Sequence, residues 1–138
     1  MGRLLAVGTR RRALDVAVVA AGGYLGANGR YGVSLLVAGT LEATLIVNVV
    51  GSFLLGALVY RRVAVGAWSS RLGLLFGTGF LSSFTTYSTF VLDATTHPGH
   101  AIPYVLASYA LGFGAVLLAR GVIRRATGGD RIDGGDRL

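Results

Sequence analysis

Four long apolar segments, separated by short polar stretches, form the main pattern of this chain. Each approaches the length of about 20 apolar residues that a helix needs to cross the hydrocarbon core of a bilayer. The segments run over residues 13–31, 43–60, 72–92 and 101–119. The pattern therefore predicts an all-α membrane protein with four transmembrane helices in a single domain, 1–138. The Gly- and Asp-rich tail, 126–138, is expected to be disordered.

The distribution of arginine predicts how these helices are oriented. Four spans place both termini and the middle loop on one side of the membrane, and that side holds every arginine of the chain except Arg30. By the positive-inside rule, both termini face the cytoplasm of a plasma-membrane protein. Arg30 lies at the end of the first span, where its side chain either snorkels to the interface or ties helices together through backbone carbonyls.

Composition narrows the possible classes of function. Soluble domains carry about 25% charged residues, whereas this chain is 14% charged and 53% hydrophobic. Its net charge of +7 does not indicate nucleic acid as a partner, because the arginines flank apolar segments as they do in proteins of the lipid bilayer. The chain has no cysteine, which excludes disulfides and thiolate catalysis. No nucleophile–base pair or paired carboxylates lie within a span, so we do not expect an enzyme.

The third segment combines rings and hydroxyls at an unusual density. The stretch GFLSSFTTYSTFV, residues 79–91, contains six Ser or Thr residues and four Phe or Tyr residues. At helical spacing, Phe76, Phe80, Phe84 and Tyr87 share one face. Rings often serve only packing, and hydroxyls can bond to the carbonyl four residues earlier. Two glycines just upstream weaken the helix, so we expect a break, which is tolerated only where freed backbone groups line a cavity or bind an ion.

A primary amide and closely spaced glycines mark the other two segments. Asn48 lies in the middle of the second segment, where it either holds the helices together through a hydrogen bond or faces a polar pathway. Its NH₂ group offers two donors to an anion without adding a charge. Ring edges are also electropositive, so the amide, hydroxyls and rings together suit a small hydrated anion. Gly22 and Gly26 allow a close approach between helices.

Three motifs in order resemble the CrcB/Fluc family of fluoride channels. GGYLGANGRY, residues 22–31, is similar to GGxxGAxxRY, and TLIVNVVGSFLLG, residues 44–56, is similar to TLxVNxxGSFxxG. GFLSSFTTYSTF, residues 79–90, resembles GFxGGxTTFSTF. Two departures stand out: Tyr87 replaces a phenylalanine, and Ser82 and Ser83 replace a pair of glycines.

The resemblance implies an inverted pair of subunits with narrow pores through which fluoride leaves the cell passively. It also implies a role for particular residues. Asn48 would be the pore amide, and Phe84 and Tyr87 would occupy two aromatic positions. The polar residues of the pathway would be Thr44, Thr85, Thr86, Ser88, Tyr104 and Ser108. A structural sodium ion would bind backbone carbonyls of Gly79 and Ser82, and Arg30 would have a structural role.

The strong arginine bias suggests a partner other than an identical chain. An inverted homodimer requires a chain that inserts in both orientations, so we expect a related second chain of opposite orientation. Two alternatives remain for the function. One is a non-conducting subunit of a heterodimeric channel. The other is a small multidrug-resistance-type exporter, which needs a carboxylate within the membrane, whereas Asp15, Glu42 and Asp93 all lie at the ends of segments.

Overall fold

A computed structural model describes residues 2–66 and 69–128, and within those ranges every regular element is a helix. The all-α prediction is confirmed. The elements are α1 (Gly2–Leu36), α2 (Thr40–Val65), α3 (Ser70–Gly73), the π-helical segment η1 (Leu74–Leu81), α4 (Ser82–Phe84), α5 (Tyr87–Thr96) and α6 (Ala101–Ala126). The predicted third segment therefore corresponds to four consecutive short elements, α3 to α5. The segments predicted at 13–31, 43–60 and 101–119 lie within α1, α2 and α6.

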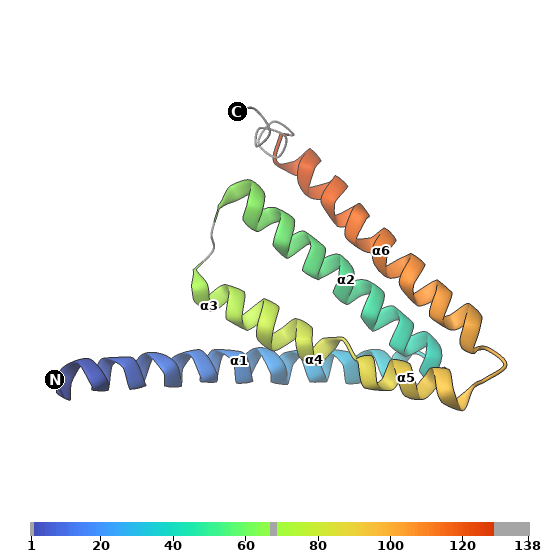
Figure 1. The fold of residues 1–138 in the computed structure, drawn as a ribbon, viewed down its shortest axis with the longest axis horizontal. Helices are drawn as coiled ribbons and strands as arrows, with labels where there is room; N and C mark the ends of the chain where they lie inside the picture. Colours follow the sequence, from blue (N-terminus) through green and yellow to red (C-terminus); the bar gives the residue numbers. More distant parts are fainter. Residues whose placement is uncertain (1, 67–68, 129–138) are drawn as a thin grey trace.

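The helices form two pairs that diverge from one end of the molecule (Figure 1). Helix α2 packs along α6, and α1 packs along η1 and α4. The α5–α6 connection lies where the two pairs meet, whereas the start of α1, the end of α2 and the end of α6 lie at the open end. Successive segments thus run in alternating directions, as expected for consecutive membrane crossings.

Two of the described helices, α2 and α6, are individually long and apolar enough to cross a membrane. The third segment does not meet this criterion because its helix is interrupted. The first contains Asp15, Asn28 and Arg30 together with several glycines, which lower its hydropathy. Helix α6 continues through Ala126 to a turn at Thr127 and Gly128. Most of the predicted disordered tail, 129–138, lies outside the described residues.

Glycines bring α1 into backbone contact with η1. A β-carbon added at Gly79 would lie 2.6 Å from the carbonyl oxygen of Val19 and 2.9 Å from the Cα of Gly22. Added at Gly26, it would overlap the carbonyl oxygen of Phe80. Such spacing is typical of membrane helices, which associate through small residues because lipid gives no hydrophobic driving force for their contact.

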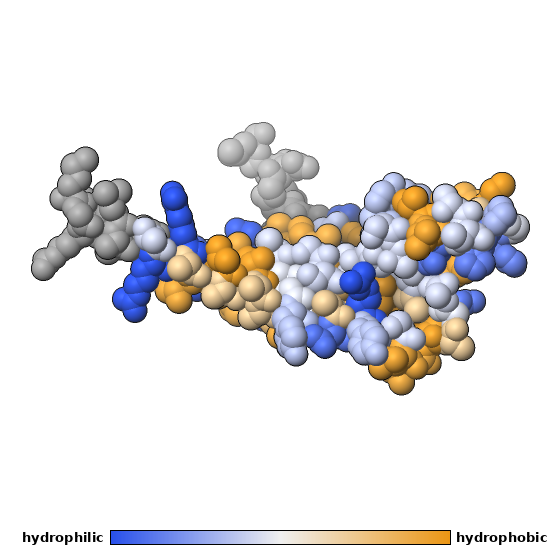
Figure 2. Space-filling model, turned by 90° about the horizontal axis from the view of Figure 1, so that it is seen from below, coloured by the Kyte–Doolittle hydropathy of each residue, from blue (hydrophilic) through white to orange (hydrophobic). Residues whose placement is uncertain are grey.

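The buried core is thin, and much of the apolar surface is exposed. Val47 of α2 is 1% exposed, and Ala119 of α6, which faces Gly56 of α2, is 0% exposed. In contrast, Ile102 and Phe113 on α6 are 74% and 68% exposed. Figure 2 shows patches of hydrophobic residues, separated by weakly polar and charged residues, on one outer face of the molecule. A surface of this kind needs lipid or a second subunit to cover it.

Candidate functional site

The helix break lies at Thr85 and Thr86, between α4 and α5. Both residues are extended, with ψ angles of 158° and 120°. The glycines that led us to expect a break, Gly77 and Gly79, instead lie within the π-helical segment η1. Helix α5 restarts at Tyr87 because Thr86 caps it: the Thr86 hydroxyl accepts a hydrogen bond from the N–H of Thr89 at 3.2 Å.

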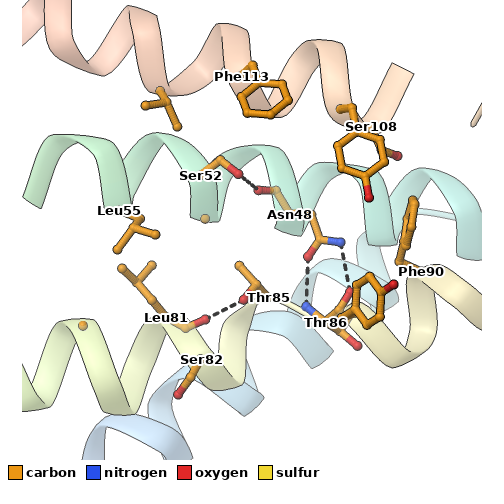
Figure 3. A pocket seen from close by; sticks show the side chains of 16 residues that line it. Asn48, Ser52, Leu55, Leu81, Ser82, Thr85, Thr86, Phe90, Ser108 and Phe113 are labelled. Carbon is orange, nitrogen blue, oxygen red and sulfur yellow. Dashed lines mark hydrogen bonds between the residues drawn. The ribbon is translucent and has the colours of Figure 1, made fainter. Parts of the chain in front are cut away.

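Asn48 holds the break from the facing helix α2 (Figure 3). Its Nδ2 donates to the carbonyl of Thr86 at 3.0 Å, and its Oδ1 accepts from the N–H of Thr86 at 2.9 Å. The side-chain amide thus satisfies both backbone groups of an interrupted residue, which lipid could not do. One of its two N–H donors remains for another acceptor. The interhelical hydrogen bond, one of the two alternatives that the sequence left open, is present, and Asn48 also lines a cleft.

Ser52 and Gly51, which lie close to Asn48 on α2, also fit the geometry of the break. The hydroxyl of Ser52 donates to the carbonyl of Asn48 at 2.8 Å. A β-carbon at Gly51 would overlap the methyl group of Thr85, so only glycine lets the two segments come this close. The VNVVGSF motif is therefore a surface that is complementary to the interrupted third segment.

A cleft of about 570 Å³ opens between α2, α6 and the interrupted segment. Asn48 and Ser52 line it from α2, and Ser108 lines it from α6 (Figure 3). From the interrupted segment come Ser82, Thr85, Thr86, Tyr87 and Phe90. Of the residues proposed for the fluoride pathway, the structure thus brings together Asn48, Thr85, Thr86, Tyr87 and Ser108.

The aromatic rings lie in a different arrangement from the single stripe that helical spacing predicts. Phe84 stacks on Phe80, with ring centroids 5.4 Å apart, and packs beside Gly29 of α1 and Gly51 of α2 without lining the cleft. Tyr87 instead pairs with Phe90, at 5.9 Å. Once a helix restarts at Tyr87, residues 87 and 90 share a face, so knowledge of the break would have identified Phe90 from the sequence.

The other polar residues predicted for the pathway, and Arg30, do not line this cleft. Arg30 and Thr44 line a second cavity of about 280 Å³, and Thr86 lines both cavities. Ser88 is exposed, with its hydroxyl 3.4 Å from that of Thr86. Tyr104 is buried, and its ring centroid lies 5.3 Å from that of Phe90.

Asp93 is a buried residue that sequence reasoning placed only at the end of a segment. It is 4% exposed, and its Oδ2 has no hydrogen-bond partner. The signal that could have identified it is its position three residues after Phe90, which places both on one side of α5.

A family model described as "CrcB-like protein, Camphor Resistance (CrcB)" matches residues 17–120. The chain belongs to the CrcB-like family. The matched range includes Asn48, the break at Thr85 and Thr86, and all of α6 that lines the cleft. The family assignment, together with the two span-length helices, makes this a membrane protein.

Curated relatives cover most of the chain. It is 50% identical over 114 residues to "Fluoride-specific ion channel FluC 1" of Haloarcula marismortui, a match that covers 83% of this chain and 89% of that protein. The protein of the same name from Natronomonas pharaonis is 50% identical over 111 residues, covering 79% and 93%. "Fluoride-specific ion channel FluC 2" of Halobacterium salinarum is 44% identical over 121 residues, covering 86% and 94%. These names describe ion channels rather than enzymes, and they do not favour an exporter.

Proposed function

We propose that this chain forms a fluoride-selective channel, through which fluoride leaves the cell passively and cytoplasmic fluoride stays low. The observation that carries the proposal is the cleft in which an amide, several hydroxyls and aromatic rings meet beside a helix break. The shared family and the names of the curated relatives support the same ion.

The chemistry of the cleft suits fluoride, which is small and strongly hydrated. Asn48 keeps one N–H donor beyond its bond to Thr86, and the hydroxyls of Ser52 and Ser108, which here donate to the carbonyls of Asn48 and Tyr104, can turn toward an entering ion. The edges of the Tyr87 and Phe90 rings are electropositive and attract an anion without the strong binding that a fixed charge would give. Such a lining replaces lost water while still letting the ion leave.

We propose that a second subunit in inverted orientation closes the open side of the cleft. The cleft is open along one side in the single chain, and large apolar side chains such as Phe113 are exposed at its edge. Covering this face would exclude water and lipid from the pathway. The partner is a related chain rather than an identical one, because the arginine bias favours a single orientation. Relatives numbered FluC 1 and FluC 2 are compatible with two such chains working together.

The direct test is fluoride efflux from proteoliposomes that contain this chain, followed with a fluoride electrode. Fast fluoride efflux by this chain alone, without chloride efflux above that of protein-free vesicles, would establish the channel and show that identical chains can pair. If the chain alone is silent, it should be reconstituted with a second family member of opposite orientation. Efflux only in the mixture would show a heterodimer, and continued silence would favour the non-conducting subunit.

The orientation proposal predicts that all copies of this chain insert in one direction. Because the chain has no cysteine, single cysteines can be introduced at Gly99, in the α5–α6 connection, and at Ser70, at the start of α3. With a membrane-impermeant maleimide applied to intact cells, we expect labelling at Gly99→Cys and none at Ser70→Cys until the cells are opened. Equal labelling of both variants in intact cells would show dual insertion and support an inverted homodimer.

We also propose that a structural sodium ion binds at the helix break. The N–H of Thr86 bonds to Asn48 rather than to the carbonyl of Ser82, four residues earlier, so this carbonyl is left as a possible ligand. The Gly79 carbonyl fits less directly, because it accepts a hydrogen bond from the Ser82 hydroxyl at 3.3 Å. Equal thermal stability of the purified assembly in sodium and in an organic cation would contradict a structural sodium ion.

A further inference from the structure

Arg120 lies just beyond one end of the cleft. Ser108, Gly112 and Val116 line the cleft from α6 and follow one another at intervals of four residues. Arg120 comes four residues after Val116, so it continues the same face of the helix about 6 Å farther along the axis. This is the open end of the molecule (Figure 1), and therefore the side that is proposed to face the cytoplasm.

The guanidinium of Arg120 is held where α2 and α6 touch. It lies over the ring of Tyr60 on α2, 6.0 Å from the ring centroid, a distance at which the face of an aromatic ring attracts a cation. The helices are close here, because a β-carbon at Gly56 would lie 3.2 Å from the side chain of Ala119. An arginine that only anchored α6 at the membrane surface would extend toward the lipid headgroups, whereas Arg120 packs on a neighbouring helix.

Arg120 also has an unused hydrogen-bond donor. Within the described residues, its Nε is buried and has no hydrogen-bond partner. A buried donor without an acceptor costs free energy, so an acceptor that reaches this position is stabilised. The guanidinium is always charged and has no acceptor of its own, and the matching ligand is therefore an anion.

The carboxylates in the described part of the chain lie elsewhere. Asp15 is on the same side of the membrane segments, but its Oδ1 lies 3.6 Å from Nε of Arg71. Glu42 is in the first turn of α2, and Asp93 is on α5, both toward the end where the helix pairs meet. The positive charge of Arg120 is thus available to an ion at the open end of the cleft.

Apolar residues separate Arg120 from the polar part of the cleft. Leu55, Gly77 and Val116 line the end that is nearer to Arg120, whereas Asn48 lies farther in (Figure 3). An anion that enters such a stretch loses water and finds few donors in return. Apolar walls also screen a charge poorly, so the field of Arg120 acts on the ion along this stretch.

We infer that Arg120 gathers fluoride at the cytoplasmic end of the cleft and so lowers the fluoride concentration at which the channel is half-saturated. This inference rests on the proposed function and orientation. Efflux begins on this side, where fluoride is scarce, and a fixed cation that raises its local concentration speeds its entry. Because Arg120 lies before the apolar stretch rather than within the pathway, it attracts the ion without trapping it. Tyr60 acts as a positioning residue for the guanidinium.

The test is the fluoride conductance of the reconstituted, conducting assembly, recorded over a range of fluoride concentrations that are equal on both sides of a bilayer. For Arg120→Gln, we expect the conductance at low fluoride to fall about fivefold, as for a unit charge removed roughly 10 Å from the ion. At saturating fluoride, the conductance should stay within about twofold of the parent, because the charge acts on entry. Arg120→Lys keeps the charge and should retain at least about half of the parent's conductance at low fluoride.

The matched control is Arg125→Gln, which removes the same charge from the same helix. Arg125 is exposed and lies on the opposite side of α6 from Val116, so the conductance at low fluoride should stay within about twofold of the parent. Screening gives a second measurement. Raising an impermeant salt from about 0.05 M to about 0.5 M should lower the low-fluoride conductance of the parent toward that of Arg120→Gln.

Two outcomes would overturn the inference. One is an Arg120→Gln conductance that equals the parent's at every fluoride concentration. The other is a fall of equal proportion at low and saturating fluoride, which would make Arg120 a structural residue of the α2–α6 contact. If Arg120→Gln does not assemble, the salt series on the parent and on Arg120→Lys decides, because a low-fluoride conductance that is insensitive to salt contradicts the inference. A parent assembly without current at any fluoride concentration would instead contradict the proposed function.

Discussion

Replacing Asn48 with aspartate should reduce fluoride efflux by about 100-fold or more. Aspartate is similar in size and can still accept the hydrogen bond from the N–H of Thr86. It cannot donate to the Thr86 carbonyl when ionised, so one buried backbone group loses its partner. It also brings a negative charge to the cleft, where repulsion of an anion at 4 Å amounts to about 4 kcal/mol at an effective dielectric constant of 20. Each 1.36 kcal/mol of barrier changes the rate about tenfold.

The matched control for this variant is Ser52→Ala. Ser52 lines the same cleft on the same helix, but its hydroxyl bonds only to the carbonyl of Asn48, four residues earlier on α2. Loss of the Ser52 hydroxyl removes one polar contact, and it neither disturbs the break nor adds a charge. Efflux should therefore fall less than about tenfold. Efflux from proteoliposomes with equal protein content measures both variants. An Asn48→Asp assembly that is intact on size exclusion and conducts like the parent would show that the ion does not pass Asn48.

Replacing Gly26 with alanine should clearly reduce the stability of the fold. The added β-carbon would overlap the carbonyl oxygen of Phe80 and lie 3.0 Å from the backbone N of Phe84. These are backbone atoms of η1 and α4, so a rotamer change cannot relieve the overlap, and α1 must move away. Overpacking of this kind costs roughly 1–3 kcal/mol. Because α4 carries the break, the geometry around Thr85 and Thr86 should also be disturbed.

Gly32→Ala is the control, since a β-carbon at Gly32 meets no atom within 4 Å. It lies on the same helix and makes the same chemical change. We expect the midpoint of thermal unfolding in detergent to fall by several degrees for Gly26→Ala, at about 2–8 °C per kcal/mol, and to stay unchanged for Gly32→Ala. Equal midpoints for the two variants would show that the close contact between α1 and the third segment does not contribute to stability.

The family assignment could be made from the sequence because it depends on short motifs. Each motif contains positions at which the neighbouring atoms in the fold allow few other residue types. Gly51 must be glycine beside Thr85, and Asn48 provides both a donor and an acceptor for one backbone residue. The amide could be recognised as important from its place in an apolar segment, although its partner 38 residues away could not.

The sequence by itself determined the helical class, the approximate extent of the apolar segments, and the uneven arginine distribution on which the proposed orientation rests. These properties depend on how many apolar or charged side chains occur in each stretch, and such counts need no knowledge of contacts. The sequence also indicated that the third segment would break, because it combines hydroxyls with glycines.

Only the tertiary structure decided where that break lies and which groups it brings together. A helix ends where another segment offers its backbone better partners, and here Asn48 of α2 offers them to Thr86 rather than to the glycines upstream. The break changes the helical phase, so Tyr87 pairs with Phe90 while Phe84 packs against α1. The contact between the Phe90 and Tyr104 rings likewise depends on α5 and α6 lying side by side, a relation between two helices that no local pattern encodes.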